Sequence, residues 1–264
     1  MYERAAAAPS APVSLVHMDE GRALWLGARG YLASHNGGAP VYLVGLYGKF
    51  RLRMRGGDWR LCRAAVIPPG LWHELDFFGE PFAALYLEPN VGGAESLFPF
   101  LREKDAADGV AFGAPDEVDL MRSLYERPDG ERAAGLQLDD LLAFSNKIAD
   151  AAPIDPRLRA VVDFLQAHCE DLTPVADLAG RVGLSGSRFQ HLFTAQIGAP
   201  FRRYRAWNRL RSACRALARG QSVTMAALEA GFFDSAHLAH EFRKTFGSTP
   251  SAQGKQATHL GAIR

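Results

Sequence analysis

The sequence predicts an α+β chain of two domains, in which a β domain precedes an all-α domain. Short apolar runs alternate with Gly- and Pro-rich turns through residues 13–115, a pattern typical of antiparallel strands. From Asp116 onward the apolar residues recur at helical spacing. Beyond Pro156 one helical pattern occurs twice. A chain of 264 residues is long enough for two domains that each bury a core.

The β domain is predicted from strands that recur about every ten residues, which favours a sandwich or a small barrel, and we expect a barrel. Residues 1–12 are rich in Ala and Pro and are expected to form a disordered leader. Arg51, Arg53 and Arg55 alternate with apolar residues, so this strand should have one solvated face and one buried face. The predicted strands are residues 24–26, 31–34, 41–47, 50–54, 59–66, 72–77 and 82–87.

Two amphipathic helices are predicted next, within residues 116–152. Their apolar stripes consist of Val118, Met121, Leu124 and Tyr125, and then of Leu138, Leu141, Leu142, Ser145 and Ile148. These helices either cover the β domain or form a dimer interface, and we expect a segment that supports a homodimer. Pro153 and Pro156 end it, so the second domain is expected over residues 153–254, followed by a tail over 255–264.

The charge is divided unequally between the two domains. Residues 1–153 carry 15 Lys and Arg against 21 Asp and Glu, whereas residues 154–264 carry 15 against 8. A basic excess confined to one domain is typical of a surface that meets phosphate groups. The charge therefore favours a nucleic-acid partner for the second domain.

The repeat covers residues 179–200 and 227–250. The matching positions are Ala179, Gly183, Phe189, Phe193, Ile197, Gly198 and Pro200 in the first copy, and Ala227, Gly231, Leu238, Phe242, Phe246, Gly247 and Pro250 in the second. The second copy has one additional residue in its turn and another before its proline. Matching over about 20 residues indicates a structural repeat.

Each copy is predicted to be a helix-turn-helix. Gly183 and Gly231 provide the backbone freedom that ends the first helix. Ser185 and Asp234 are candidate N-caps of the second helix. The apolar residues at four-residue spacing bury its inner face, and such modules lay the outer face in the major groove of double-stranded DNA.

The candidate DNA-contacting residues lie on these outer faces and on the segment that joins the two copies. Gln pairs with adenine and Arg with guanine through two hydrogen bonds each. The joining segment, residues 201–219, is a predicted helix that should span ~30 Å, close to the ~34 Å between successive major-groove faces. The candidates are Ser187, Arg188, Gln190, His191 and Thr194 on the first copy, Arg202, Arg203 and Arg209 on the joining helix, and Ser235, Ala236, His237, His240, Arg243 and Lys244 on the second copy.

These residues resemble the AraC/XylS family of bacterial transcription regulators. The motifs are AGRVGLSxSxFxxLF at residues 179–193 and AGFxDxxxLxxxFRKxFGxTP at residues 230–250. The resemblance implies contact with two adjacent grooves, usually as a dimer, and RNA polymerase as a partner. His240 departs from the family pattern, in which an arginine is frequent, and the end after Pro250 lacks the usual aromatic and basic residues.

The N-terminal half is similar to the cupin-like barrel that such regulators carry for effector binding, on the pattern IPPGLWHE at residues 67–74. His35, Tyr42, Trp72 and His73 are candidates to line a small-molecule pocket. The alternative is that Tyr42 and Trp72 belong to the core and that His73 closes a turn. The isolated histidines lack metal-ligand spacing, so we expect neither a metal nor a cofactor.

The leading interpretation is therefore a cytoplasmic, sequence-specific DNA-binding regulator, without enzymatic activity, modulated by an effector. Two alternatives are a metal enzyme of the cupin type with an appended nucleic-acid module, and an interaction module that binds protein. No apolar run approaches the ~20 residues that cross a bilayer. Cys62, Cys169 and Cys214 are widely spaced, as expected in a reducing compartment.

Overall fold

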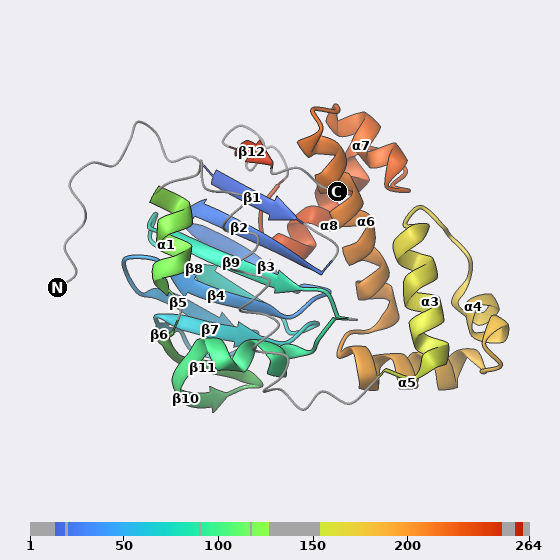
Figure 1. The fold of residues 1–264 in the computed structure, drawn as a ribbon, viewed down its shortest axis with the longest axis horizontal. Helices are drawn as coiled ribbons and strands as arrows, with labels where there is room; N and C mark the ends of the chain where they lie inside the picture. Colours follow the sequence, from blue (N-terminus) through green and yellow to red (C-terminus); the bar gives the residue numbers. More distant parts are fainter. Residues whose placement is uncertain are drawn as a thin grey trace.

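The computed structural model describes residues 14–18, 21–89, 91–116, 118–126, 154–249 and 257–260, which form a β domain beside a helical domain (Figure 1). The leader predicted for residues 1–12 and the second helical stripe predicted for residues 138–148 lie outside this range. No helix in the described ranges is long and apolar enough to cross a membrane.

The β domain contains a large sheet and a small sheet. The large sheet has the order β10-β11-β7-β4-β9-β2-β1-β12, antiparallel except for β12 beside β1. Its strands are β1 (Ser14–Met18), β2 (Arg22–Ala28), β4 (Val41–Gly45), β7 (Ala64–Ile67), β9 (Pro81–Leu87), β10 (Leu101–Ala107), β11 (Val110–Pro115) and β12 (Ala257–Leu260). The small sheet has the order β3-β8-β5-β6, with β3 (Tyr31–His35), β8 (His73–Asp76), β5 (Phe50–Met54) and β6 (Arg60–Cys62).

The two sheets pack face to face as a sandwich, so the prediction of a closed barrel was wrong. Among the described strands, no backbone ladder joins one sheet to the other. The chain changes sheets between β6 and β7, where a single strand had been predicted. Arg63 lies at this change and donates to the carbonyls of Gly45 and Leu46, at 2.7 and 2.9 Å.

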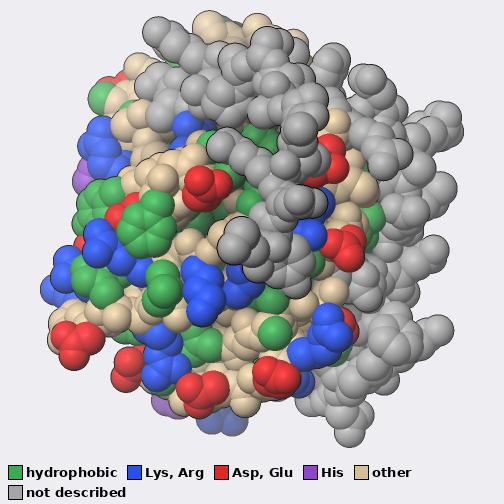
Figure 2. Space-filling model, turned by 90° about the vertical axis from the view of Figure 1, so that its left-hand side faces the viewer, with side chains coloured by type: hydrophobic (Ala, Val, Ile, Leu, Met, Phe, Trp, Pro, Cys, Tyr) green, Lys and Arg blue, Asp and Glu red, His purple; other side chains and the backbone are tan. Residues whose placement is uncertain are grey.

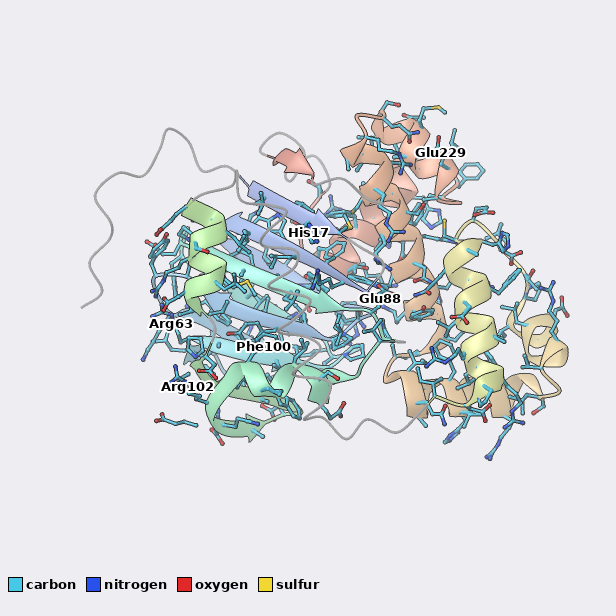
Figure 3. The ribbon with its side chains drawn as sticks, viewed as in Figure 1. His17, Arg63, Glu88, Phe100, Arg102 and Glu229 are labelled. Atoms are coloured by element: carbon cyan, nitrogen blue, oxygen red, sulfur yellow. The ribbon has the colours of Figure 1, made fainter. Side chains whose placement is uncertain are left out.

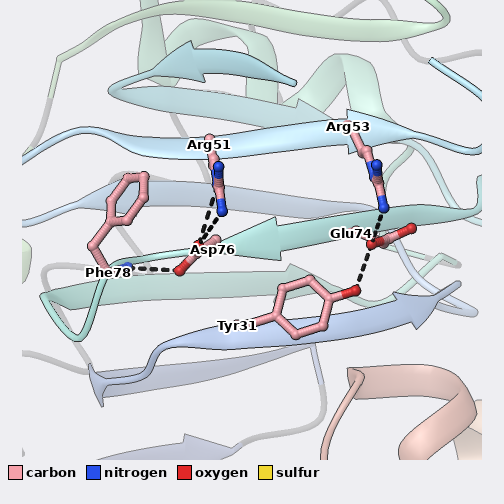
Figure 4. Close-up of polar contacts among 6 residues, drawn as sticks. All are labelled: Tyr31, Arg51, Arg53, Glu74, Asp76 and Phe78. Atoms are coloured by element: carbon pink, nitrogen blue, oxygen red, sulfur yellow. Dashed lines mark hydrogen bonds and ion pairs between the residues drawn. The ribbon is translucent and has the colours of Figure 1, made fainter. Parts of the chain in front are cut away.

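The outer face of the small sheet is the solvated face that the alternating arginines predicted. Arg51 and Arg53 on β5 each form an ion pair of 2.9 Å with the opposite residue of β8, Asp76 and Glu74 respectively (Figure 4). Tyr31 of β3 also donates to Glu74, at 2.5 Å. Charges of both signs intermingle on the side of the molecule turned away from the helical domain (Figure 2).

The centre of the large sheet is buried on both faces because a second layer covers the side away from the small sheet. Strand β4 is buried throughout: Val41 and Leu43 face the small sheet, and Tyr42 faces the cluster that includes Met121 and Leu124. These last two belong to α1 (Val118–Glu126), which packs with the 3-10 segment η1 (Ala94–Phe100). The first predicted stripe therefore covers its own β domain.

The helical domain consists of two helix pairs on either end of one long helix. The pairs are α4 (Val175–Arg181) with α5 (Gly186–Ile197), and α7 (Val223–Glu229) with α8 (Ser235–Phe246); α6 (Phe201–Ala218) joins them and α3 (Pro156–Ala167) packs on α6. Helix α6 has 18 residues, a length of about 27 Å. Each pair has its own apolar cluster, so the predicted repeat and joining helix are confirmed.

Candidate nucleic-acid interface and domain-interface cavity

Helix α5 has one buried face and one polar, exposed face. Its N-cap is Ser185, whose hydroxyl accepts from the Arg188 N–H at 3.2 Å, as predicted. Phe189 and Phe193 are fully buried and fix the helix on the domain core. The predicted reading residues are all exposed: Ser187, Arg188, Gln190, His191 and Thr194.

Helix α8 repeats this arrangement with different side chains. Asp234 caps it by accepting from the His237 N–H at 2.7 Å. Among the predicted residues Ala236, His237, His240 and Arg243 are exposed, whereas Ser235 and Lys244 are half-buried. The Nδ1 atom of His237 accepts from the Phe233 N–H at 3.4 Å. A neutral His237 ring therefore carries its proton on Nε2 and can donate from that atom.

The joining helix presents fewer arginines to solvent than predicted. Arg202 is exposed. Arg203, with an 11% exposed side chain, instead donates to the Asn36 carbonyl of the β domain and lies 3.8 Å from Glu241. Arg209 is half-buried and donates to the carbonyls of Cys169 and Asp171, each at 3.3 Å. The β domain and the loop after α3 cover parts of α6 that the sequence suggested were available to phosphate.

A buried ion pair joins the two domains through α6. Glu88, just after β9, lies where the β domain meets the helices (Figure 3) and has no exposed surface. It accepts from Trp207 Nε1 at 2.6 Å and from Arg211 at 2.8 Å. Gln166 of α3 donates to the same carboxylate at 3.2 Å. Burial raises the pKa of the Glu88 carboxyl, while Arg211 and Trp207 oppose the rise. Sequence patterns do not predict this pair, because Glu88 and Arg211 are far apart along the chain.

The β domain also contacts the C-terminal ends of both α5 and α8. These helices end at Gly198 and Gly247, equivalent positions of the repeat, with φ of 76° and 70°. A Cβ added to Gly198 would lie 3.4 Å from Pro69, and one added to Gly247 would lie 2.8 Å from both the Ala33 carbonyl oxygen and His35 Nδ1. The β domain therefore contacts each helix at the end opposite its N-cap.

A cavity of about 80 Å³ lies between the sheets and is closed by α6 and the end of α8. This is several times the roughly 10–15 Å³ that one water molecule needs. Most of its wall is apolar, with contributions from both domains. The side chains on the wall that carry polar groups are Arg29, His35, His73, Tyr86, Trp207, Arg211, Cys214 and Ser248. Burial lowers the pKa of Arg29.

His35 and His73 form a pair on this wall, with tilted rings whose centroids are 4.3 Å apart. Their Nδ1 atoms donate to the carbonyls of Ala33 and Leu71, at 2.7 and 2.9 Å. Burial lowers the pKa of both rings, that of His73 to about 4. Both rings are therefore neutral near pH 7 and keep Nε2 as a hydrogen-bond acceptor.

The other two candidates for a pocket lie elsewhere. Tyr42 is fully buried on the opposite face of the large sheet, where its ring stacks on Phe100 at 5.2 Å. Trp72 lines a separate surface hollow beside Arg55. Strand alternation explains the difference for Tyr42, since neighbouring residues of β4 face opposite layers. The structure thus brings only His35 and His73 together.

Known proteins resemble the helical domain in sequence. Residues 178–256 match the family model of a helix-turn-helix domain. The HTH-type transcriptional regulator RipA of Corynebacterium glutamicum is 31% identical over 99 residues, 38% of this chain and 30% of the relative. The arabinose operon regulatory protein of Escherichia coli is 30% identical over 101 residues, 38% of this chain and 35% of the relative. The C-terminal part of the chain is an AraC-type helix-turn-helix domain.

The alignments span about a third of the length of these curated relatives. The arrangement of the AraC-type domain beside the sandwich has counterparts among solved structures. An apo variant of ToxT from Vibrio cholerae has a TM-score of 0.62 at 10% identity and covers 90% of this chain and 98% of its own. Wild-type ToxT bound to an unsaturated fatty acid has a TM-score of 0.61 at 10% identity, covering 92% and 98%. The likeness shows that the two-domain fold is shared.

Within the described residues, no group of three or more His, Cys, Asp or Glu side chains is placed to hold a metal ion. Cys214 shares the cavity with His35 and His73, and burial raises the pKa of its thiol to about 12. The AraC-type domain and the sandwich therefore meet around a cavity whose histidines are available as hydrogen-bond acceptors.

Proposed function

We propose that the chain is a sequence-specific, DNA-binding transcription regulator, and not an enzyme, that acts in the cytoplasm. The observation that carries this proposal is the pair of capped helices, α5 and α8, each anchored by buried apolar side chains and each with exposed polar residues. Helix-turn-helix proteins read the major groove with such helices. The regulatory role of the curated relatives supports the same function.

The two helices are proposed to read DNA unequally. Arg188 and Gln190 of α5 have the hydrogen-bond geometry that selects guanine and adenine. On α8 the donors are His237 and His240, and Arg243 is placed for phosphate contact. We therefore assign most of the hydrogen-bonded base selection to α5.

Fluorescence anisotropy on a duplex selected from a random pool tests this assignment. We expect the affinity of the full chain to fall at least tenfold between 50 and 200 mM salt, because phosphate contacts release counterions. Arg188→Ala with Gln190→Ala should reduce the preference for the selected duplex over random DNA by at least tenfold, at about 1–3 kcal/mol per base pair lost. Arg60→Ala, on the outer face of the β domain, is the control. Salt-independent binding, or unchanged discrimination in the double variant, would contradict the proposal.

The cavity is proposed to bind an effector with an apolar body and a carboxyl group. Its apolar wall fits the body, and the guanidinium group of Arg29 places positive charge beside it, whereas that of Arg211 is paired with Glu88. The Nε2 atoms of the histidine pair are available to a donor on the ligand. Two ToxT structures with this fold were solved with an unsaturated fatty acid and with a naphthalenyl butenoic acid.

Differential scanning fluorimetry with hexanoic acid, a carboxylic acid small enough for a cavity of about 80 Å³, tests the effector class. The acid should raise the melting temperature of the full chain, whereas the alcohol of the same length should raise it less. Arg29→Met should remove the difference between acid and alcohol, and Arg55→Met, outside the cavity, should preserve it. Equal shifts by acid and alcohol on the wild-type chain would exclude the carboxyl group as a determinant.

The residues of the cavity wall suggest how a bound effector would change the binding of DNA. Trp207 of α6 and Phe246 of α8 form part of the wall, and His35 lies against the end of α8 at Gly247. A ligand that moves these side chains changes the support of α8 relative to α5. We propose this route for regulation, together with a homodimer as the functional form and RNA polymerase as a partner, in line with two-fold symmetric half-sites.

A further inference from the structure

Phe233 is the most exposed large apolar side chain of those the structure describes, at 85%. It lies in the turn between α7 and α8, directly before the N-cap Asp234. Large exposed aromatic side chains commonly belong to binding surfaces. Its position at the N-terminal end of a candidate reading helix places it where such helices approach base edges.

Phe233 is the additional residue by which the second turn exceeds the first. The N–H groups of Leu184 and Phe232 donate to the carbonyls of Ala179 and Ala227, each at 2.9 Å, so these two residues are equivalent. The N-caps Ser185 and Asp234 are also equivalent, yet one residue separates Phe232 from its N-cap. Phe232 is buried in the core of the second pair. The core is therefore complete without Phe233.

The backbone of Phe233 is joined to the reading surface. Its N–H donates to His237 Nδ1 at 3.4 Å, and the His237 ring also meets the edge of Phe232 at 5.3 Å. Ala236, also exposed, follows on the first turn of α8. Phe233 and Ala236 thus add apolar surface beside the polar donor His237.

We propose that Phe233, together with Ala236, contacts the 5-methyl group of a thymine in the groove read by α8. The inference rests on the proposed function and adds a specificity-determining residue to it. The thymine methyl is the one apolar group that base edges present in the major groove, and Phe and Ala are side chains that contact it. His237 would donate to a neighbouring acceptor, so that α8 selects thymine by shape beside a hydrogen bond.

The alternative occupant is a protein. Met225 and Leu228 of α7 are also exposed, at 50% and 52%, and could extend an apolar patch. The hydrogen bond from Phe233 to His237 favours DNA, because it ties the aromatic residue to a residue of the reading face. The test below separates the two.

The experiment replaces each thymine of the selected duplex, one at a time, by deoxyuridine, which removes only the methyl group. Anisotropy then gives the affinity of the full-length wild type, Phe233→Leu, Phe233→Ala and the matched control Phe78→Ala, another exposed Phe on the β domain. One deoxyuridine substitution in the half of the site protected by α8 should weaken DNA binding by about threefold to tenfold. We expect this loss for the wild type, Phe233→Leu and Phe78→Ala. Phe233→Ala should bind the duplex with thymine and the duplex with deoxyuridine with the same affinity. That affinity should equal the weaker one that the wild type shows for the deoxyuridine duplex.

Equal sensitivity of Phe233→Ala and the wild type to every deoxyuridine would overturn the inference and leave the protein partner as the occupant. A selected site without thymine under α8 would overturn it as well. If α5 variants lose binding while Phe233→Ala binds like the wild type, the regulator function stands and only this inference fails. Failure of the chain to select any duplex would remove the proposed function and the inference together.

Discussion

At the scale of single residues, the histidine pair shows how burial sets chemistry. His35 and His73 would be partly charged near neutral pH if exposed, since the ordinary pKa is about 6.5. Inside the sandwich their Nδ1–H groups satisfy backbone carbonyls, and two charged rings 4.3 Å apart would repel each other. The pair therefore folds in the neutral form.

The neutral pair predicts a loss of stability in mild acid. The unfolded chain protonates His73 below about pH 6.5, whereas the folded chain does so only near its pKa of about 4. The contribution of the neutral His73 ring to stability is thus fully present above pH 6.5. It is lost as the pH drops towards 4, which lowers the free energy of unfolding by up to about 3 kcal/mol. Urea unfolding at pH 7.5 and 5.0 measures the effect. Between these two pH values His73→Gln should lose less stability than the wild type. The exposed control His191→Gln should lose as much stability as the wild type. An equal loss in all three proteins would contradict the assignment to His73.

Local chemistry could be read from the sequence where partners are close along the chain. Ser185 and Asp234 cap α5 and α8 as predicted, because an N-cap and its amide are three residues apart. Arg203 was expected to face DNA, and Tyr42 was expected either to line a pocket or to belong to the core. Their surroundings depend on distant elements, because Arg203 donates to the Asn36 carbonyl and Tyr42 packs in the core with η1. Residue type indicates which interactions these side chains can make, but not which part of the fold they contact.

At the scale of elements, the periodicity of apolar residues predicts the packing of the repeated helices better than the pairing of the strands. Helical spacing and the glycines between helices predict the helix pairs, since the contacts within each pair join residues that are close along the chain. Strand pairing depends on remote partners, so the barrel was preferred wrongly over the sandwich and the change of sheet at Arg63 was missed. Strand β10 was also missed because five successive residues of it are exposed, which gives no alternation.

The two helix-ending glycines give an element-scale prediction. Replacing either glycine by Ala should lower the free energy of unfolding by a similar amount, roughly 1–2 kcal/mol, because the left-handed backbone conformation is unfavourable for Ala. At Gly247 the added Cβ would also meet the Ala33 carbonyl oxygen and His35 at 2.8 Å, whereas at Gly198 it meets only the Pro69 ring at ordinary contact distance. Gly247→Ala should therefore lower the free energy of unfolding by at least about 1 kcal/mol more than Gly198→Ala. Urea denaturation compares them, and equal losses would mean that the β domain does not hold α8 tightly.

At the scale of the whole molecule, the β domain acts as a support for both reading helices. It contacts the ends of α5 and α8, encloses the cavity with α6 and the end of α8, and is joined to α6 by the buried pair of Glu88 and Arg211. Removing one partner of such a pair typically costs about 3–5 kcal/mol. The domains are therefore held in a defined arrangement, and the ligand that we propose for the cavity would act on the same contacts.

The central claim is that one chain reads two successive major grooves through α5 and α8. Hydroxyl-radical and methylation protection on the selected duplex tests it most directly. We predict, for each bound chain, two protected major-groove segments on one face of the duplex with centres about one helical turn, 10–10.5 base pairs, apart. Arg188→Ala with Gln190→Ala should weaken one segment selectively, and Phe233→Ala the other. A single protected segment per chain, or two segments on opposite faces of the duplex, would contradict the account.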